Sequence, residues 1–361
     1  MKNNQAIPFN KENFKQIFSK EFALVIIVSI PGALIAEYFN VPLAWFLGPM
    51  LVTSIVSLTG FKTKMPRLVL STVLIFLGLY IGNYIDKNLF SQIHQWVWTS
   101  LIMLVYIILS VLLVSKYLQK FSGYEKKTSI FSAAPGALGP LLILAEDEKS
   151  DLSHVATSHL IRLIIIITVF PFILNSFYDT ESVHLIEPVI SEQNIIDLLI
   201  LIALSIVLIL IIDRFKIPAA LLAGTLVASG FLQITEIASY KLPENIIDYC
   251  LLILGSSVGC RFADKTFNEI RKNVIHSFVA TLLLVLLGLC AAYIAGLFID
   301  KNFFTLLLSY CPGGIYEVAV IAIFFDLDPE FVSFHHIIRL LMILFVVPII
   351  LKIIYRNKKP A

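Results

Sequence analysis

The chain has 361 residues, of which 58% are hydrophobic and 14% charged. Ordinary soluble domains carry about 25% charged residues. The net charge of +2 is too small to favour a nucleic-acid partner. The composition therefore excludes a soluble globular domain and predicts an all-α integral membrane protein.

Apolar segments near the length that crosses a bilayer, roughly 20 residues, follow one another along the chain. Residues 1–21 are polar, lack the pattern of a cleaved signal peptide and are predicted to be a cytoplasmic N-terminal segment. A first membrane repeat covers residues 22–175, an acidic external connection residues 176–194, a second membrane repeat residues 195–354, and a cytoplasmic tail residues 355–361. The predicted segments are 22–38, 41–58, 67–85, 97–118, 128–146 and 154–175, then 195–212, 217–235, 246–262, 274–299, 303–325 and 332–354.

The two halves match each other at a shift of 176–177 residues. Residues 134–137, Ala-Pro-Gly-Ala, match residues 311–314, Cys-Pro-Gly-Gly. Residues 159–162, His-Leu-Ile-Arg, match residues 336–339, His-Ile-Ile-Arg. Matching glycine pairs, spaced as in closely packed membrane helices, are Gly78 with Gly82 and Gly255 with Gly259. We interpret this pattern as an internal duplication.

The fifth segment of each half has Pro-Gly in its middle. Proline removes a helical donor and glycine loosens the backbone, so a broken or re-entrant helix is predicted there. If these segments do not cross, each half crosses five times and the halves are inverted. Lys- and Arg-rich loops and both termini then lie in the cytoplasm, as the positive-inside rule favours. The prediction is two inverted repeats of five transmembrane helices, each with one broken or re-entrant Pro-Gly segment.

Inverted repeats with breaks at matching positions are typical of secondary transporters, whose substrates bind where half-helices end. Glu317 lies well inside an apolar segment, where it could couple protons, bind substrate or pair with a buried arginine. Arg162 and Arg339 could attract an anion, pair with Glu317 or snorkel to the interface. His159 and His336 suit polar helix packing better than proton transfer. The predicted substrate-binding residues are Pro135, Gly136, His159, Arg162, Pro312, Gly313, Gly314, Glu317, His336 and Arg339.

Other polar residues have simpler interpretations. Asp151 and Asp328 precede the sixth segments and are predicted to cap those helices. Four cysteines, predicted to be free and buried, are Cys250, Cys260, Cys290 and Cys311. The sequence has no recognisable catalytic, metal-binding or cofactor-binding motif, so we predict no enzyme, metal site or cofactor.

Several of these residues together resemble the AbrB family of bacterial polytopic membrane proteins, from about residue 22 to 354. They are Val41-Pro42 with Leu47-Gly48-Pro49, residues 259–262 (Gly-Cys-Arg-Phe), Pro-Gly-Gly followed by Glu317, and the paired His-x-x-Arg. The small soluble DNA-binding regulator that shares the name is not similar. The resemblance implies a glutamate after Pro-Gly-Gly in both halves, whereas this chain has Pro140 in the first half. Proteins of this family have been labelled ammonia monooxygenases, regulators of gene expression or transporters, and the resemblance implies one of these functions.

We predict a secondary transporter of a small polar or anionic solute, with proton coupling as an option, in the bacterial inner membrane. A membrane-embedded regulator or scaffold that influences gene expression indirectly is the alternative. A membrane ammonia monooxygenase is disfavoured because the sequence offers no metal site. The predicted partners are the lipid bilayer and a small-molecule or ion substrate, with no nucleic acid. The sequence is compatible with a homo-oligomer and does not decide the oligomeric state.

Overall fold

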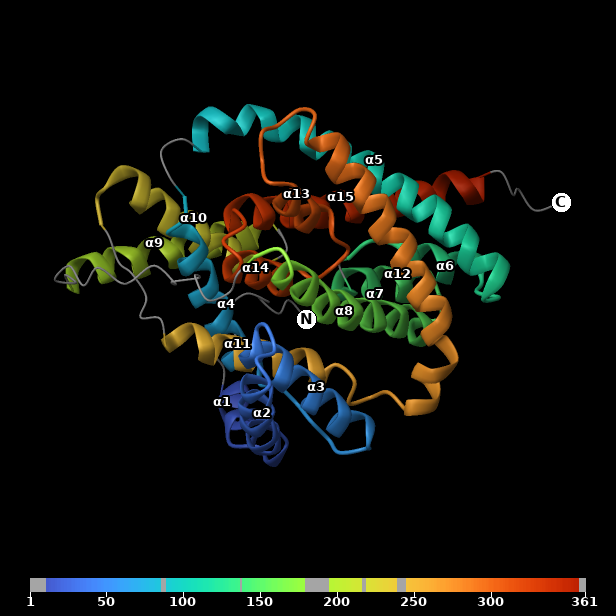
Figure 1. The fold of residues 1–361 in the computed structure, drawn as a ribbon, viewed down its shortest axis with the longest axis horizontal. Helices are drawn as coiled ribbons and strands as arrows, with labels where there is room; N and C mark the ends of the chain where they lie inside the picture. Colours follow the sequence, from blue (N-terminus) through green and yellow to red (C-terminus); the bar gives the residue numbers. More distant parts are fainter. Residues whose placement is uncertain are drawn as a thin grey trace. The chain divides into compact units, whose positions relative to one another are not determined.

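A computed structural model of the chain describes residues 11–85, 89–136, 138–178, 195–215, 219–238 and 245–356. Within these ranges every regular element is a helix (Figure 1), which confirms the all-α class. Residues 1–10, 179–194 and 357–361 lie outside the described part, and with them most of the predicted connection and tail. The first-half helices are α1 (Lys11–Ile17), α2 (Lys20–Tyr38), α3 (Ala44–Leu58), α4 (Arg67–Gly82), α5 (Leu89–Phe121), α6 (Lys126–Ala133), α7 (Leu138–Asp147) and α8 (Leu152–Asn175). The second-half helices are α9 (Ile195–Arg214), α10 (Ala220–Thr235), α11 (Asn245–Cys260), α12 (Phe267–Ala295), α13 (Phe303–Tyr310), α14 (Ile315–Phe324) and α15 (Pro329–Arg356).

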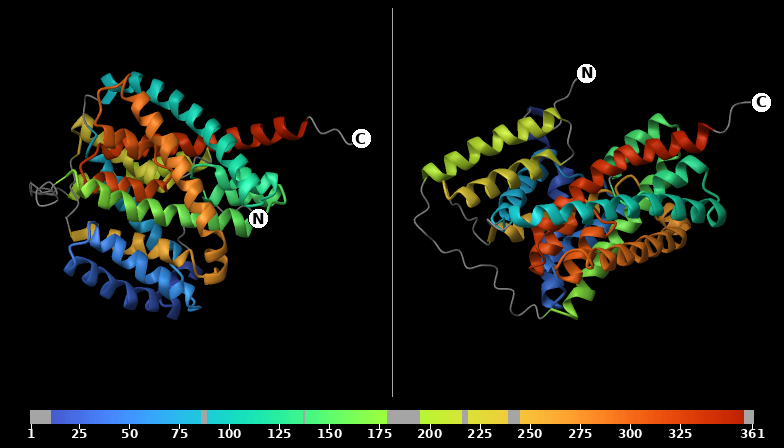
Figure 2. Two further views of the ribbon diagram at one scale, coloured as in Figure 1. Left: turned by 45° about the vertical axis from the view of Figure 1, so that its right-hand side comes forward. Right: turned by 90° about the horizontal axis from the view of Figure 1, so that it is seen from above.

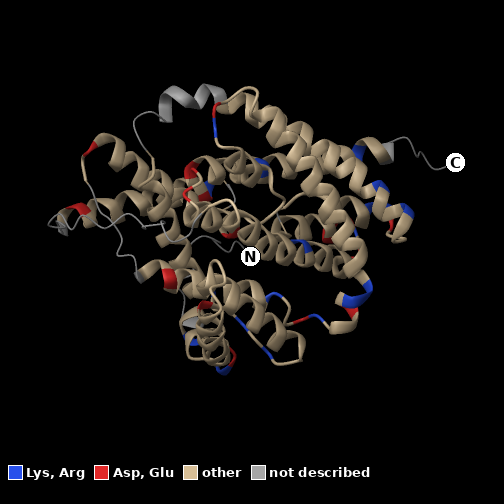
Figure 3. Ribbon diagram, in the orientation of Figure 1, with Lys and Arg blue, Asp and Glu red and all other residues tan. Residues whose placement is uncertain are grey.

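Six of the described helices are long and apolar enough to cross a membrane, namely α2, α5, α8, α9, α12 and α15. The helices α3, α4, α10, α11 and α14 are also apolar but shorter. Figure 3 shows that Lys, Arg, Asp and Glu gather at helix ends and connecting segments, which leaves long stretches of helix without charge. Such helices satisfy their own backbone hydrogen bonds in lipid, so the chain is a membrane protein.

The helix order recurs between the two halves of the described chain. Helix α6 begins at Lys126 and α13 at Phe303, and α8 begins at Leu152 and α15 at Pro329, a shift of 177 residues each time. Leu43 before α3 and Ala219 before α10 both have left-handed backbone, with φ of 54° and 60°. The same uncommon backbone conformation thus recurs 176 residues apart, as an internal duplication would produce.

Both fifth segments are broken at Pro-Gly, as predicted. Helix α6 ends at Ala133 and α7 starts at Leu138, while α13 ends at Tyr310 and α14 starts at Ile315. The residues after the first half-helices have nearly identical extended backbone, with φ and ψ of −61° and 130° at Ala134 and −60° and 131° at Cys311. Proline follows both residues, and it disfavours helical backbone at the residue before it.

The chain folds into two compact units, and each takes helices from both halves. Unit 1 comprises Met1–Phe90, Pro171–Thr266 and Ile323–Glu330. Unit 2 comprises Ser91–Phe170, Phe267–Ala322 and Phe331–Ala361. Because of this division, both broken segments and the helices α5, α8, α12 and α15, apart from a few end residues, fall in unit 2.

Unit 1 is held together by close helix packing at glycine. The helices α2 and α3 lie side by side (Figures 1 and 2), and α4 packs on α10 as α11 packs on α3. A methyl group at Gly78 would overlap Leu222 and Thr225 of α10, and one at Gly255 would overlap the carbonyl of Phe46 in α3. These contacts confirm the close-packing interpretation of the glycine pairs, since only glycine lets the backbones approach so closely.

Unit 2 has an apolar core around α5 and α12. Val114 and Leu118 of α5 pack with Ala280 and Leu284 of α12, and Ala133 at the end of α6 joins the same cluster. The phenol of Tyr124, between α5 and α6, donates a hydrogen bond of 3.0 Å to Asn273 Oδ1 of α12. The core therefore fixes the first half-helix α6 against the long helices of the same unit.

Candidate functional site

Two side chains of α8 hold the end of α6 at the first break. The guanidinium of Arg162 donates to the carbonyl of Ala134 at 2.6 Å and also to that of Ser132. The ring Nε2 of His159 donates to the carbonyl of Phe131 at 3.0 Å. A helix leaves its last carbonyls without internal partners, and these donors satisfy them. The cation also lies at the negative end of the helix dipole.

The second break repeats this arrangement with α15 and α13. The guanidinium of Arg339 donates to the carbonyls of Cys311 and of Gly313, the latter at 2.6 Å. His336 Nε2 donates to the carbonyl of Leu308 at 2.9 Å, and His336 Nδ1 accepts from Arg339 Nη2 at 3.0 Å. The His-x-x-Arg motif is therefore a clamp on the carbonyl end of each broken helix.

All ten predicted substrate-binding residues belong to unit 2. His159, Arg162, Glu317, His336 and Arg339 are buried, with exposed fractions from 0% to 5%. Both arginines bond to backbone carbonyls, so snorkelling to the interface does not describe them. Their role in binding a substrate stays a prediction.

Gly136 of the first break comes close to the second-half clamp. Its φ is +113°, a conformation that L side chains rarely adopt. A methyl group built on Gly136 would lie 3.0 Å from Arg339 Nη2. The guanidinium of one repeat thus reaches the break of the other, and the two cations share one buried region of unit 2.

Glu317 lies in the first turn of α14, immediately after the second break. Its carboxylate lies against Gly314, the residue before the helix, where a methyl group would overlap it. A glutamate at the third helical position commonly folds back in this way to cap the positive end of its own helix. Pro140 occupies the same position of α7, whose first turn has no acidic residue.

A buried polar network beside the second break was not predicted from the sequence. His335 hydrogen-bonds through Nε2 to Thr99 Oγ1 at 2.7 Å and through Nδ1 to the carbonyl of Phe331 at 2.9 Å. Tyr310, the last residue of α13, donates to the carbonyl of Thr99 at 2.7 Å. Single Thr and Tyr residues inside apolar segments are common, so no sequence pattern indicates that these residues are linked.

The four cysteines are free, as predicted, but not all are buried. Cys250 and Cys311 are buried, whereas Cys290 is exposed at the surface of the chain and Cys260 is partly exposed. Cys290 departs from the prediction because it lies on an outer face of α12, which an apolar helix in lipid can leave uncovered by protein. In the part of the chain that the structure describes, no three His, Cys, Asp or Glu side chains form a group suited to a metal ion.

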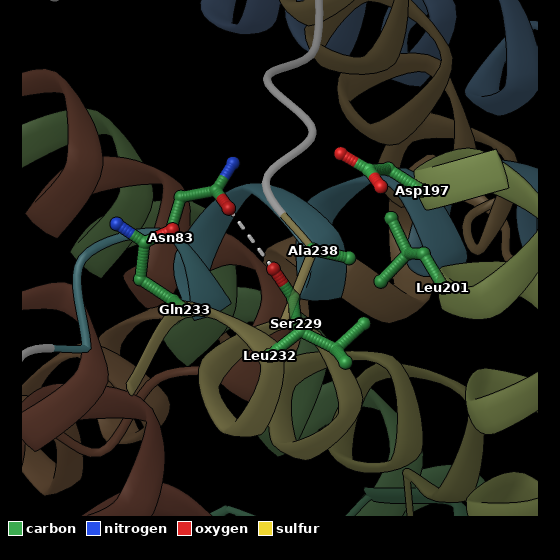
Figure 4. Close-up of a pocket in the computed structure, with 7 residues that line it drawn as sticks. All are labelled: Asn83, Asp197, Leu201, Ser229, Leu232, Gln233 and Ala238. Carbon is green, nitrogen blue, oxygen red and sulfur yellow. Dashed lines mark hydrogen bonds between the residues drawn. The ribbon is translucent and has the colours of Figure 1, made fainter. Parts of the chain in front are cut away.

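Unit 1 contains a small polar hollow, drawn in Figure 4. Ser229 donates to Asn83 Oδ1 at 3.0 Å across it. The hollow offers about 10 Å³ to a sphere of the size of water, which suits a single water molecule and no organic solute. The hollow is therefore too small to be the site of an organic solute. The lining residues are Asn83, Asp197, Leu201, Ser229, Leu232, Gln233 and Ala238.

The fold and these paired breaks define a helical membrane protein with a duplicated, interrupted-helix core. The sequence model of a family described as "Transition state regulatory protein AbrB" matches residues 2–87 and 45–355. The chain therefore belongs to the AbrB family, as the sequence resemblance predicted. Given its length and apolar helices, it belongs to the membrane proteins of that name and not to the small soluble regulators.

Two relatives align with most of the chain. "Putative regulator AbrB" of Escherichia coli (strain K12) is 26% identical over 334 residues, which cover 89% of this chain and 93% of that protein. "Uncharacterized protein YhjN" of Bacillus subtilis (strain 168) is 20% identical over 348 residues, 90% of each chain. No solved structure matches the chain.

Proposed function

We propose that this chain is a secondary transporter of a small polar or anionic solute, with its site at the two Pro-Gly breaks of unit 2. The observation that carries the proposal is the pair of broken helices at matching positions, each clamped by a buried His-x-x-Arg. Broken helices in the membrane occur where backbone is buried in protein or lines a cavity, and repeat-based transporters bind solutes there. A charged cluster at membrane depth is costly, which favours a functional role.

The proposed topology has ten crossings and two broken or re-entrant segments, with both termini in the cytoplasm of the bacterial inner membrane. In this arrangement the two halves have opposite orientation. Lysines and arginines then concentrate in the cytoplasmic loops, while residues 176–194, which contain no Lys or Arg, lie outside. Opposite orientation would give one break access from each side of the membrane.

Accessibility of the two breaks tests the proposal without knowledge of the solute. Single cysteines are placed by Leu138→Cys and Ile315→Cys after the native cysteines are removed. Cys250, Cys260 and Cys290 become Ser, and Cys311→Ala copies Ala134, the matching first-half residue. Intact cells and inside-out vesicles are then treated with a membrane-impermeant thiol reagent. Exposed loop positions provide controls through Glu125→Cys for the cytoplasmic side and Asp300→Cys for the outside.

We expect position 138 to react from the cytoplasm and position 315 from the outside, as water-lined inverted breaks require. Protection of both positions from both sides, with the loop controls reacting normally, would refute the transport proposal. Such protection would mean that the breaks lie in a packed bundle without water, which would favour the membrane-embedded regulator or scaffold.

Glu317 is the proposed coupling or substrate-contacting residue. Glu317→Gln should abolish solute-evoked currents in proteoliposomes adsorbed to a solid-supported membrane. Glutamine can still cap α14, so the variant should fold. Glu146→Gln, at an exposed position near the end of α7, is the matched control and should leave the currents unchanged. Equal currents from Glu317→Gln and the wild type would remove Glu317 from the mechanism.

A further inference from the structure

The two breaks are matched in backbone but not in charge. Helix α14 starts with Glu317 in its first turn, and the carboxylate lies against Gly314. Helix α7 starts with no acidic residue, and Pro140 stands at the matching position. The positive end of α14 thus has an anionic group from its own chain, whereas that of α7 has none in its first turn.

The buried charges around the breaks do not balance. Among the buried residues that the structure describes, those with formal charge are Arg162, Arg339 and Glu317. Two cations and one carboxylate leave one positive charge. Both guanidinium groups bond to backbone carbonyls, and within the described ranges neither has a carboxylate oxygen within 4.0 Å. A buried cation without a carboxylate partner is unfavourable even where carbonyls accept its N–H groups, so a monoanion would be stabilised there.

Unused hydrogen-bond donors lie at the first break. Arg162 Nε is buried without a partner, although the same guanidinium donates to Ala134 and Ser132. Ser132 Oγ, one turn or less from the break, is also buried without a partner. At the second break the matching Ser309 Oγ donates to the carbonyl of Thr305 at 2.8 Å. A ligand at the first break would find a serine donor that the second break has already used.

We propose that a small monocarboxylate binds at the amino-terminal end of α7, in the place that the Glu317 carboxylate holds at α14. The inference rests on the transporter proposal and names its substrate class. Arg162 Nε, Ser132 Oγ and the first amide groups of α7 would donate to the carboxylate, with Arg339 close by at Gly136. One negative charge matches the one uncompensated cation, whereas a dicarboxylate would leave a buried negative charge.

The test uses the full-length protein with its single cysteine at position 138, and the probes are sodium acetate and sodium L-lactate. Acetamide and lactamide serve as neutral isosteres, with sodium chloride added to match the ionic strength. At ten times the half-protecting concentration, labelling at position 138 should slow about tenfold, because the ligand-free fraction falls to about one eleventh. The amides should not slow it.

Pro140→Glu supplies the missing carboxylate from the chain itself. It should remove the effect of acetate and lactate, because the added side chain fills the anion's place. Pro140→Gln restores the same backbone N–H without the charge and should keep the effect. Labelling of the Glu125→Cys control and the gel-filtration profile establish that both variants are folded.

The outcomes separate this inference from the transporter proposal. Sided labelling of positions 138 and 315 that neither carboxylate slows would overturn the carboxylate site and leave transport standing. Equal slowing by the amides, or an unchanged effect in Pro140→Glu, would also overturn it. Protection of both positions from both sides would refute transport, and the carboxylate site would fall with it.

Discussion

Replacement of Arg339 by Gln measures how much the clamp contributes to the fold. The side chain is buried, and it donates to the carbonyls of Cys311 and Gly313. Hydrogen bonds from a charged donor contribute about 1.5–3 kcal/mol each, so the pair contributes about 3–6 kcal/mol. Loss of the buried charge removes a desolvation penalty, which offsets part of the damage. In the variant, the carbonyl of Cys311 would still accept a hydrogen bond from the backbone N–H of Gly313, which is 2.8 Å long in the structure. We therefore expect a loss near the lower end, about 3 kcal/mol.

The assay is equilibrium unfolding of the purified protein in mixed micelles with increasing denaturing detergent, followed by circular dichroism. Arg271→Gln is the control, because Arg271 is exposed near the start of α12 and its replacement should change stability by less than about 0.5 kcal/mol. Arg162→Gln should cost a similar amount, because Arg162 also donates to two backbone carbonyls. If Arg339→Gln were no less stable than the Arg271 control, the clamp would not hold the break, and the arginine would be available for another role.

Two further predictions concern single contacts. Gly255→Ala should lower the free energy of unfolding by about 1–3 kcal/mol, because the added methyl group would overlap the carbonyl of Phe46. The control Gly139→Ala should be neutral or stabilising, because a methyl group there meets nothing within 4 Å. Similar unfolding curves for the two variants would refute the packing argument. Asp151→Ala should cost about 1 kcal/mol, because Asp151 Oδ1 accepts from the backbone N–H of His154 at 3.0 Å and caps α8. Partial burial alone would raise the pKa of Asp151, but the backbone N–H and ring of His154 outweigh it and hold the pKa below its usual value. The cap's contribution is therefore present above the unfolded pKa of about 3.9 and lost as the pH falls through the folded value, so unfolding curves of wild type and Asp151→Ala should converge only below about pH 4.

The sequence predicted the elements of this fold well because each carries a local signal. Apolar runs between charged loops identify membrane helices, and most described helices overlap the predicted segments. Helix α1 was not predicted, and α5 and α12 begin about seven or eight residues earlier than expected, because polar residues at their starts hid the helical continuation. The Pro-Gly pairs located both breaks, since proline and glycine act on the backbone where they stand. The glycine pairs predicted close packing but not the partner. That α4 packs on α10, and α11 on α3, depends on contacts across the duplication, which spacing along one helix does not contain.

The chemistry of the arginines could not be predicted in the same way. A buried arginine in a membrane segment suggests an anionic partner, and Glu317 is the nearby candidate. In the structure, both guanidinium groups instead donate hydrogen bonds to backbone carbonyls 26–30 residues earlier in the sequence. The sequence shows that each motif comes a fixed distance after a break, yet it does not show that the break leaves carbonyls in need of donors. That requirement appears only when the end of α6 or α13 is placed beside α8 or α15.

A duplicated frame also explains why the two breaks can differ. His159 and Arg162 perform for α6 the structural task that His336 and Arg339 perform for α13, so both breaks are held without help from Glu317. The third residue of the helix after each break is therefore not needed to hold the break and can diverge. Glutamate at 317 and proline at 140 are the result in this chain. Since the clamps bring equal positive charge to unequal surroundings, we propose that the first break has the stronger attraction for an external anion. A buried charge without a charged partner lowers stability. Substitutions that remove the charge imbalance would therefore be expected to accumulate if the imbalance had no function.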